Sequence, residues 1–551
     1  MNLTIPLTLL DQLEQAGIKH PVISASKQRY RDDVEFSTFS VPRAYLEKLQ
    51  SYLAKEPKEH QRLLQKLSQF GDVVRKGQEM VPKRLDTLES ALTNTIVRTS
   101  KHRWLWSADD NLPYVVKQIT YKPAQKDDPA YVSIDMKFTA KGSTHSRRVT
   151  YHQSDIQSNM PISVLLFNRG LVTETKELVT AYETRMGDWQ EVYDAHSEQF
   201  ILTTDNLNRD ASEEEERYGR RELTHRANSR GEFRVVNDVS VAKLGKIEDY
   251  ISVKSMPTIS EDDEPGEAWF DYDEDSVTNF PVPLHPYVLV FNLETHAHMW
   301  VPSEKLSPYK YRTDLINSLV LPERHKTLIG ILTNDIDVLQ ADIVAGKSAG
   351  TIVLCHGEPG LGKTLTAEGY SEAAQKILYR VQSDQLGTEP NGLEKNLRQI
   401  FANAQRWGAV LLIDEVDIYV HERGLDIDQN AIVGTLLRTL EYFSGLIFMT
   451  TNRDVVVDDA ILSRCSAVIR YDYPDDTDAE RLYGMFAELF GLTLPVDLVR
   501  EFRISHPRLS GRTIKNVLRL TARRGLLNPS LKDLLDTKEF VVQQATSKPN
   551  D

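Results

Sequence analysis

Hydrophobic positions recur at helical spacing along the first hundred residues. Leu46, Leu49 and Leu53 would lie on one face of a helix, and the same spacing returns before residue 100. No heptad pattern persists over several repeats, which favours helices that pack within a domain over a partner-binding coiled coil. We therefore expect a helical N-terminal domain over residues 1–100.

Alternation between apolar and polar residues replaces this spacing from about residue 101. Val132 and Ile134 alternate with polar neighbours, and residues 287–293 are also rich in strand-forming side chains. Residues 175–193 show helical spacing again. The region 101–310 is therefore predicted to be a β-rich α+β domain, and we expect it to select a partner or substrate.

Two strongly polar stretches with acidic runs interrupt the β-rich region, at residues 205–230 and 260–276. Such runs are typical of solvated loops or linkers rather than of sites for a metal or a basic partner. A short apolar run at residues 162–167, in contrast, has the length of a strand.

Two histidines, His296 and His298, alternate on a predicted strand and would face the same side of a sheet. Two imidazoles could begin a metal site, but no further cluster of ligands is evident in the sequence. Two ordinary histidines at a strand edge are therefore the favoured interpretation.

The hydrophobic pattern changes once more after residue 321. Short apolar runs at residues 351–354, 410–413 and 446–450 alternate with helical stretches. This alternation predicts an α/β region with a parallel sheet, which we expect to span residues 311–473.

The composition is that of an ordinary globular protein with an acidic balance. The 551 residues are 40% hydrophobic, and 66 basic against 80 acidic side chains give a net charge of −14. This balance disfavours a protein built to coat nucleic acid or anionic membranes. Two cysteines exclude a disulfide scaffold and favour a cytoplasmic setting. The N-terminus lacks the pattern of a signal peptide, and no apolar run approaches the roughly 20 residues of a membrane span.

A glycine-rich loop follows the first apolar run of the α/β region. It fits the pattern G-x-x-x-x-G-K-S/T, in which glycines clear the space for backbone N–H groups to contact a phosphate chain. In such a loop Lys363 can reach the β- and γ-phosphates, and the Thr364 hydroxyl can bind Mg²⁺. The residues expected to bind ATP are Gly357, Glu358, Pro359, Gly360, Leu361, Gly362, Lys363, Thr364 and Leu365.

Two carboxylates, Asp414 and Glu415, follow the second apolar run, and Asp414 comes 51 residues after Lys363. An aspartate at the carboxyl end of a buried strand can hold Mg²⁺, so Asp414 joins Thr364 in the expected metal site. The adjacent Glu415 can polarise the water that attacks the γ-phosphate, which makes it the candidate catalytic base.

A polar amide and an arginine follow the third apolar run. Asn452 would stand beside the γ-phosphate if the strand before it lies between the other two strands. Arg464 comes 12 residues later, in the segment DDAILSRC, and taken alone it would be read as a solvated side chain.

The glycine-rich loop, the segment LLIDEVD, the Asn of TTN and the Arg of DDAILSRC together resemble an AAA+ ATPase, over about residues 319–535. The resemblance implies a P-loop AAA+ parallel sheet followed by a helical lid. It also implies that Asn452 is the sensor 1 residue. Arg464 would be the arginine finger, which acts on the ATP of the neighbouring subunit.

The lid implied by the resemblance spans residues 474–540 and precedes a tail at 541–551. Arg512, in the segment SGRT, corresponds to a sensor 2 arginine that contacts the γ-phosphate in its own subunit. Thr477 and Glu480 have the spacing of a capping box for the first lid helix.

Two departures from the family pattern bear on mechanism. Many AAA+ proteins that unfold polypeptides carry an aromatic residue in a central pore loop, whereas residues 385–392 contain none. The finger segment has one arginine, Arg464, where many relatives have two. The segment LYRVQSDQLG and its neighbours resemble, more narrowly, a little-characterised AAA subgroup with long, unique N-terminal regions.

These observations favour a Mg²⁺-dependent ATPase that forms a homo-oligomeric, hexameric ring and remodels a protein partner through residues 1–310. Two alternatives stay open. A nucleic-acid-handling or nucleic-acid-sensing ATPase would use the locally basic residues 145–148 and 217–230, although the net charge weighs against it. A nucleotide-switched scaffold would hydrolyse little ATP, and the presence of Glu415 argues against it.

Overall fold

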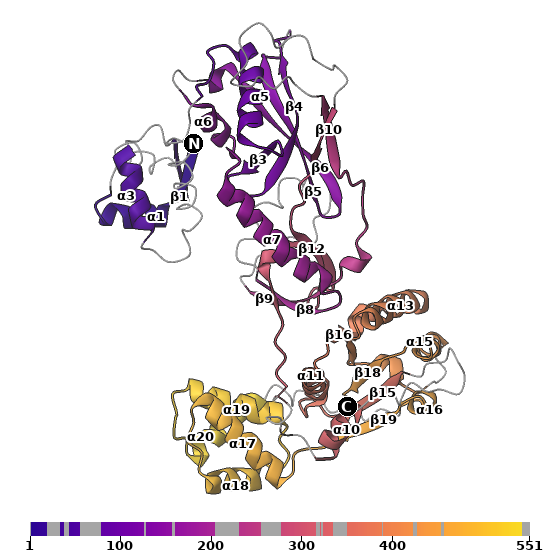
Figure 1. Ribbon diagram of the computed structural model, residues 1–551. Coiled ribbons are helices and arrows are strands. Elements are labelled where there is room, and N and C mark those ends of the chain that lie inside the picture. Colours follow the sequence, from indigo (N-terminus) through magenta and orange to yellow (C-terminus); the bar gives the residue numbers. More distant parts are fainter. Residues whose placement is uncertain are drawn as a thin grey trace. The chain divides into compact units, whose positions relative to one another are not determined.

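The computed structural model (Figure 1) describes most of the chain as helices and strands. The described residues are 2–18, 33–37, 43–54, 79–125, 128–156, 160–203, 231–254, 277–313, 315, 320, 323–333, 350–387, 389–422, 427–452 and 457–542. The predicted polar loops at residues 205–230 and 260–276 lie outside these residues, as does the basic stretch 217–230.

Contacts between residues divide the chain into two compact units. The first comprises Met1–His196, Asp238–Val290 and His298–Leu306, and the second comprises Ser197–Asn237, Phe291–Ala297 and Ser307–Asp551. The second unit therefore combines a hairpin from the predicted β-rich region with the C-terminal α/β region.

Among the first hundred residues, those that the structure describes form the predicted helices together with two short strands. The helices are α1 (Leu7–Gln15), α3 (Arg43–Leu53), α5 (Leu88–Thr99) and the 3-10 helix η3 (Leu85–Thr87). Strands β1 (Asn2–Pro6) and β2 (Asp33–Ser37) pair antiparallel, which a purely helical expectation missed. Runs of five residues are too short for their alternation to be told from helical spacing.

A five-stranded antiparallel sheet forms the core of the first unit. Its order is β6-β5-β4-β3-β7, with β3 (Trp104–Ser107), β4 (Pro113–Lys122), β5 (Tyr131–Ala140), β6 (Ser143–His152) and β7 (Leu171–Thr173). The alternation at Val132 and Ile134 is confirmed as a half-buried strand, because both side chains pack in one core with Leu88 and Leu92 of α5.

The apolar run at residues 162–167 forms helix α6 (Ile162–Phe167) rather than a strand. Nearly all of its side chains are buried, so its sequence carries no amphipathic period that identifies a helix. Helix α7 (Lys176–Asp194) confirms the helix predicted there, and the Thr175 side chain caps its first turn. None of the described helices, α7 included, is long and apolar enough to cross a membrane.

The remaining described strands of the β-rich region form one five-stranded sheet and one two-stranded sheet. The larger sheet has the order β13-β12-β9-β8-β14, with β8 (Gln199–Thr203), β9 (Glu232–Asn237), β12 (Tyr287–Asn292), β13 (Ala297–Pro302) and β14 (Leu306–Pro308). Strand β10 (Tyr250–Lys254) pairs with β11 (Val277–Pro281). Short 3-10 helices are η4 (Gln153–Asp155), η6 (Val239–Val241) and η7 (Ser303–Lys305).

The two histidines do not share one face of a strand, so this prediction was wrong. His296 lies in the turn before β13 with a φ of 55°, and its ring centroid is 5.3 Å from that of Tyr379. His298 lies on β13, where its Nε2 is 2.7 Å from the Asp238 carboxylate. Within the described part of the chain, no three His, Cys, Asp or Glu side chains gather as a metal site would require.

A parallel five-stranded sheet organises the α/β region and confirms the predicted fold class. Its order is β16-β17-β18-β15-β19, with β15 (Thr351–Gly357), β16 (Leu378–Gln382), β17 (Val410–Asp414), β18 (Leu446–Thr451) and β19 (Ala467–Tyr471). Strand β18 lies between β17 and β15. Asn452 therefore follows a strand flanked by the two strands that lead to Asp414 and to the glycine-rich loop.

Helices cover both faces of this sheet (Figure 1). One face packs against α13 (Pro390–Arg406) and α15 (Ile427–Leu440), and the other against α10 (Glu323–Thr333) and α11 (Lys363–Ala373). Along β15, Leu354 joins the first core, whereas Val353 and Cys355 join the second. Cys355 is therefore a buried core residue. Short helices are α12 (Ser383–Leu386), α14 (Asp417–Val420) and α16 (Asp459–Leu462).

Four helices follow the sheet and share a hydrophobic core of their own, in yellow tones in Figure 1. They are α17 (Asp476–Phe490), α18 (Val496–Ser505), α19 (Gly511–Arg523) and α20 (Leu531–Val542). The cap of α17 is Asp475, whose side chain accepts the Asp478 N–H at 2.8 Å. The predicted capping box was wrong, because Thr477 and Glu480 already lie inside the helix.

Candidate nucleotide site

The predicted ATP-binding residues are continuous in the chain. Gly357 ends β15, residues 358–362 form the connecting loop, and Lys363, Thr364 and Leu365 begin α11. Gly360 has a φ of 83°, which glycine adopts without steric cost. Close packing adds a second requirement, because a Cβ on Gly360 would lie 2.7 Å from the Cβ of Arg512 and 2.9 Å from the Ser510 Oγ. The absence of a side chain at Gly360 therefore lets Ser510 and Arg512 pack directly against the loop.

Lys363 begins α11 and turns its side chain back into the loop. Its Nζ donates to the carbonyl oxygens of Gly357 at 2.7 Å and Glu358 at 2.8 Å. Burial lowers the pKa of Lys363, whereas the Asp414 charge raises it. The Glu358 carboxylate accepts a hydrogen bond from the Tyr473 hydroxyl. The lysine charge thus lies at the N-terminus of a helix, where the backbone also favours an anion.

Thr364 and Asp414 face each other at the carboxyl end of the sheet. The Thr364 Oγ1 is 3.3 Å from the Asp414 Oδ1 and 3.4 Å from its Oδ2. The Thr450 hydroxyl also donates to Asp414, and the Arg380 Nη2 donates to Oδ2 at 2.6 Å. A hydroxyl oxygen and a carboxylate at this spacing are hard oxygen donors of the kind that Mg²⁺ takes alongside phosphate and water. These residues therefore fit a Mg²⁺ ion that binds together with a nucleotide.

Glu415 stands next to Asp414 with a backbone in the left-handed region, at a φ of 60°. This conformation costs a residue other than glycine about 1–2 kcal/mol, and such outliers cluster at functional sites. The Glu415 N–H donates to the Thr450 Oγ1 at 3.1 Å. The Glu415 Oε1 accepts from the Asn452 Nδ2 at 3.3 Å. The two predicted catalytic side chains are thus in contact.

Three residues at this site were missed by the sequence analysis. Asp417 accepts hydrogen bonds from the backbone of Asn452 and from Thr451, while Thr450 and Arg380 bind Asp414. Asp417 could have been found as the third carboxylate of LLIDEVD. No sequence pattern identifies Thr450 or Arg380 as a site residue, because single polar residues are common in strands.

Arg464 has different partners from the other predicted site residues. Its guanidinium pairs with Glu441, and its Nη1 donates to the Ala460 carbonyl at 3.1 Å. Glu441 follows the end of α15, and Ala460 belongs to α16. Lys363, Thr364, Asp414, Glu415 and Asn452 converge at the ends of the central strands, whereas these contacts hold Arg464 beside α15 and α16.

The lid reaches the glycine-rich loop through the start of α19. The Arg512 N–H donates to the Gly360 carbonyl at 3.2 Å. The Ser510 side chain caps α19 by accepting the Thr513 N–H at 3.2 Å. Arg512, predicted as a γ-phosphate contact, is therefore anchored at the loop itself.

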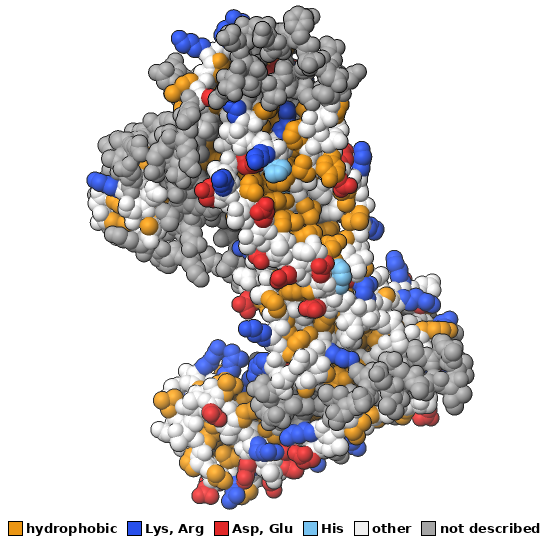
Figure 2. Space-filling view, viewed as in Figure 1, with side chains coloured by type: hydrophobic (Ala, Val, Ile, Leu, Met, Phe, Trp, Pro, Cys, Tyr) orange, Lys and Arg blue, Asp and Glu red, His pale blue; other side chains and the backbone are white. Residues whose placement is uncertain are grey.

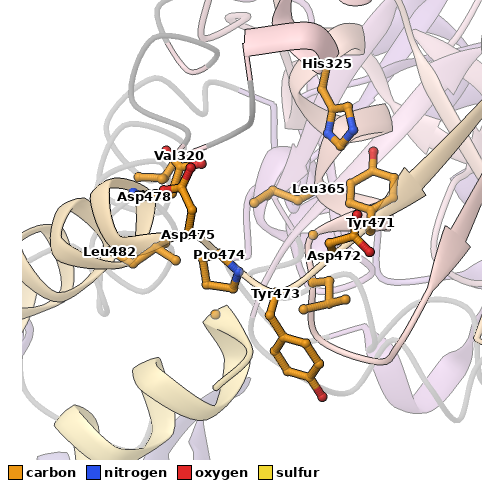
Figure 3. Close-up of a pocket in the computed structure, with 13 residues that line it drawn as sticks. Val320, His325, Leu365, Tyr471, Asp472, Tyr473, Pro474, Asp475, Asp478 and Leu482 are labelled. Atoms are coloured by element: carbon orange, nitrogen blue, oxygen red, sulfur yellow. Dashed lines mark hydrogen bonds between the residues drawn. The ribbon is translucent and has the colours of Figure 1, made fainter. Parts of the chain in front are cut away.

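A pocket of about 290 Å³ opens beside the loop, between the sheet and the lid (Figure 3). Leu361 and Leu365 line it from the loop and α11, and Leu482 lines it from α17. His325 of α10 and Tyr471 of β19 also border it, with ring centroids 4.6 Å apart. A pocket that combines apolar walls with a few polar groups suits a flat heterocyclic ring.

Comparisons with known proteins point to one family. Residues 353–473 match the model of the ATPase family associated with various cellular activities (AAA). A protein of Methanothermobacter thermautotrophicus, described as a homolog of a 26S proteasome regulatory subunit, is 29% identical over 35% of this chain and 54% of its own length. The ATP-dependent zinc metalloprotease FtsH of Ureaplasma parvum is 29% identical over 32% of this chain and 26% of its own.

A search of solved structures found the AAA domain of FIGL-1 in complex with ADP. It is 17% identical, covers 40% of this chain and 82% of that chain, and has a TM-score of 0.33. The chain spans about half the length of the archaeal relative, at 54%, and a smaller part of FtsH.

The matched residues 353–473 contain the glycine-rich loop, the Asp414–Glu415 strand end, Asn452 and Arg464. They also contain all five strands of the parallel sheet, apart from the first two residues of β15. The resemblance that the sequence motifs indicated is confirmed: residues 353–473 of this chain are an ATPase domain of the AAA family.

Proposed function

We propose that this chain hydrolyses ATP with Mg²⁺ and works as a hexameric ring that remodels a protein partner. The observation that carries the proposal is the contact between Glu415 and Asn452 beside the Thr364–Asp414 pair. A base, an amide and a pair of metal-binding oxygens thus surround the place where a γ-phosphate would lie.

Each part of the site has a defined task in ATP binding. The loop backbone and Lys363 hold the phosphates, and the pocket lined by Leu365 and Tyr471 holds the adenine ring. Thr364 and Asp414 hold Mg²⁺. When bound, Mg²⁺ neutralises charge on the β- and γ-phosphates.

Hydrolysis requires a positioned water and charge stabilisation at the γ-phosphate. The Glu415 carboxylate accepts a proton from the attacking water, and Asn452 keeps that carboxylate in place. Arg512 approaches the γ-phosphate from the lid, because its backbone is anchored at Gly360. Lid movement therefore changes the charge around the phosphate.

The ring assignment rests on Arg464. Its bonds to Glu441 and Ala460 hold it away from the residues of its own phosphate site. An arginine finger supplied by another subunit is a recurring device in phosphoryl transfer. A ring places this guanidinium at the ATP of the next subunit, so hydrolysis depends on assembly.

A protein partner is supported by two observations. The archaeal relative is named as a homolog of a proteasome regulatory subunit, and FtsH is named as a metalloprotease, so both names refer to proteins that work with protein substrates or partners. The first compact unit, which comprises Met1–His196, Asp238–Val290 and His298–Leu306, has a sheet of its own and the size needed to recognise a partner. The two free cysteines, Cys355 and Cys465, are consistent with a cytoplasmic location.

The predicted pore segment favours movement of the N-terminal domains over threading of a polypeptide. The Tyr419 hydroxyl donates to the carbonyls of Ser383 at 2.9 Å and Gly387 at 2.8 Å, and Leu386 is buried. These bonds fix the segment to α14, whereas a threading loop must follow a moving chain. Thr388, part of the same segment, lies outside the described residues.

The basic stretch at residues 145–148 gives little support to a nucleic-acid function. Arg148 pairs with Asp135, and Arg147 lies over the ring of Tyr114 with 4.9 Å to its centroid. On the face shown in Figure 2, acidic and basic side chains of the described residues are interspersed rather than sorted by sign. The described residues on this face therefore form no continuous basic surface that could bind a nucleic-acid backbone.

The proposed activity is tested by phosphate release from the purified full chain. We expect turnover that requires Mg²⁺, is lost in Lys363→Ala and persists in the matched control Lys395→Ala, which changes an exposed lysine on α13. Equal turnover in Lys363→Ala and wild type would show that the site is misassigned. Light scattering with and without ATP measures the mass of the assembly and so tests whether the chain forms a hexamer.

A further inference from the structure

One face of helix α11 carries three polar side chains, Thr364, Glu368 and Glu372, at intervals of four residues. Thr364 belongs to the proposed Mg²⁺ site at the start of the helix. Glu372 lies near its C-terminal end and is buried. This face therefore runs from the phosphates to the opposite end of α11.

Glu372 ties the far end of α11 to the β8–β9 hairpin and to the segment after β14. The Tyr309 hydroxyl donates to Glu372 Oε1 at 2.6 Å, and the Arg312 N–H donates to Oε2 at 2.8 Å. The Arg234 Nη1, on β9, is 3.6 Å from Oε1. The Arg234 guanidinium also lies over the Tyr309 ring, 4.8 Å from its centroid.

A second arginine, Arg380 of β16, lies near the N-terminal end of this face, beside Thr364 and Asp414. Its side chain rises from β16 and donates to Asp414 at 2.6 Å, although it remains 45% exposed. Glu368 lies between the two ends. Burial raises the pKa of Glu368, whereas the charges of Arg380 and Arg234 lower it. Glu368 is one helical turn from Thr364 and one from Glu372, so it lies between the carboxylates that Arg380 and Arg234 contact.

Arg380 and a Mg²⁺ ion would compete for the same partner. Asp414 Oδ2 accepts from Arg380, and the same carboxylate faces Thr364 at 3.3 Å. Two positive charges at one carboxylate repel each other, and the repulsion is strong where the carboxylate is shielded from water. A long, partly exposed arginine can turn away from Asp414. Glu368 lies one helical turn beyond Thr364, on a helix that packs against the strand of Arg380, and offers a second carboxylate.

We propose that Arg380 is a positioning residue that leaves Asp414 for Glu368 when Mg²⁺ and nucleotide bind, and thereby weakens the attachment of Arg234 to α11. Because Arg380 then neutralises Glu368, the α11 face attracts Arg234 less strongly. The β8–β9 hairpin, which carries Arg234, is held less tightly. This inference rests on the proposed Mg²⁺-nucleotide site, and it links nucleotide binding at that site to the attachment of the β8–β9 hairpin.

The first test measures Mg²⁺ affinity rather than turnover. The full chain is loaded with a fluorescent ATP analogue in EDTA and titrated with Mg²⁺. We expect Arg380→Gln to bind Mg²⁺ about 3- to 10-fold more tightly than wild type, the range for loss of a partly exposed charged hydrogen bond. The matched control Arg398→Gln, which removes an exposed arginine paired with Glu394, should leave the affinity unchanged.

The outcomes of this titration separate the inference from the proposed function. If the analogue does not bind the wild-type chain, the nucleotide site itself is refuted. If it binds but Arg380→Gln has equal or weaker Mg²⁺ affinity, the role of Arg380 is refuted while the nucleotide site stands.

The second test follows hydrogen exchange in the hairpin β8–β9, residues 199–203 and 232–237. With adenylyl imidodiphosphate, adding Mg²⁺ should speed exchange there about 2- to 5-fold in wild type, the range expected for a weakened exposed ion pair. Glu368→Gln should abolish the difference between the Mg²⁺ and EDTA samples. Identical exchange with and without Mg²⁺ in the wild-type chain would overturn the coupling.

Discussion

The Asp417 carboxylate fixes the backbone of Asn452, because its Oδ1 accepts the Asn452 N–H at 2.9 Å. The same oxygen accepts the Thr451 hydroxyl at the end of β18. Asn452 in turn donates to Glu415. The position of the proposed catalytic base thus depends on a carboxylate two residues further along the chain.

Replacing Asp417 with Asn should slow turnover without weakening ATP binding. An amide accepts hydrogen bonds more weakly than a carboxylate, and loss of a charged hydrogen bond of about 1.5 kcal/mol corresponds to roughly 10-fold. We expect kcat to fall by about that factor, with KM for ATP changed less than about 2-fold. Asp497→Asn, on the exposed side of α18, is the matched control. A rise in KM for ATP by the same factor as the fall in kcat would instead indicate a general structural role for Asp417.

Mixed rings test whether Arg464 acts across a subunit boundary. Arg464→Ala and Lys363→Ala chains should each be inactive, since arginine fingers contribute about 10³–10⁵ in rate. Mixing them should restore part of the turnover, because an Arg464 from one chain can serve an intact site in the other. Arg470→Ala, an exposed arginine paired with Asp472, should stay active alone. Verified mixed rings without any turnover would contradict the trans role.

A tagged reporter tests the pore. The active protein is offered an unstructured tag fused to a stably folded fluorescent protein, and loss of fluorescence is followed with ATP. We expect no unfolding, because the segment 385–392 has no aromatic side chain and Tyr419 fixes its backbone. ATP-dependent unfolding that disappears in Glu389→Ala or Pro390→Ala would show that this segment grips a chain.

The candidate nucleotide site could be proposed from the sequence because its parts are local. The loop from Gly357 to Thr364 needs glycines, a lysine and a hydroxyl at fixed spacing, whatever the rest of the chain does. Asp414 and Asn452 end apolar runs, and parallel strands bring such ends to one edge of a sheet. Family resemblance supplied the roles of Arg464 and Arg512, which no spacing rule gives.

Features that depend on distant partners were not predictable. Arg380 is one polar residue in a strand, and its role follows only from the neighbouring strand that ends in Asp414. The turn at His296 and the cap at Asp475 depend on where a strand or helix begins, which periodicity fixes only to within a few residues. The buried helix α6 shows no period, because it is covered on nearly every side.

ATP turnover by Glu415→Gln tests the central claim most directly. The amide keeps the size of the side chain and can still contact Asn452, but it cannot accept the proton of the attacking water. We predict that Glu415→Gln binds a fluorescent ATP analogue as tightly as wild type, while phosphate release falls about 10²–10⁴-fold. Phosphate release at the wild-type rate would contradict the assignment of this site as the centre of ATP hydrolysis.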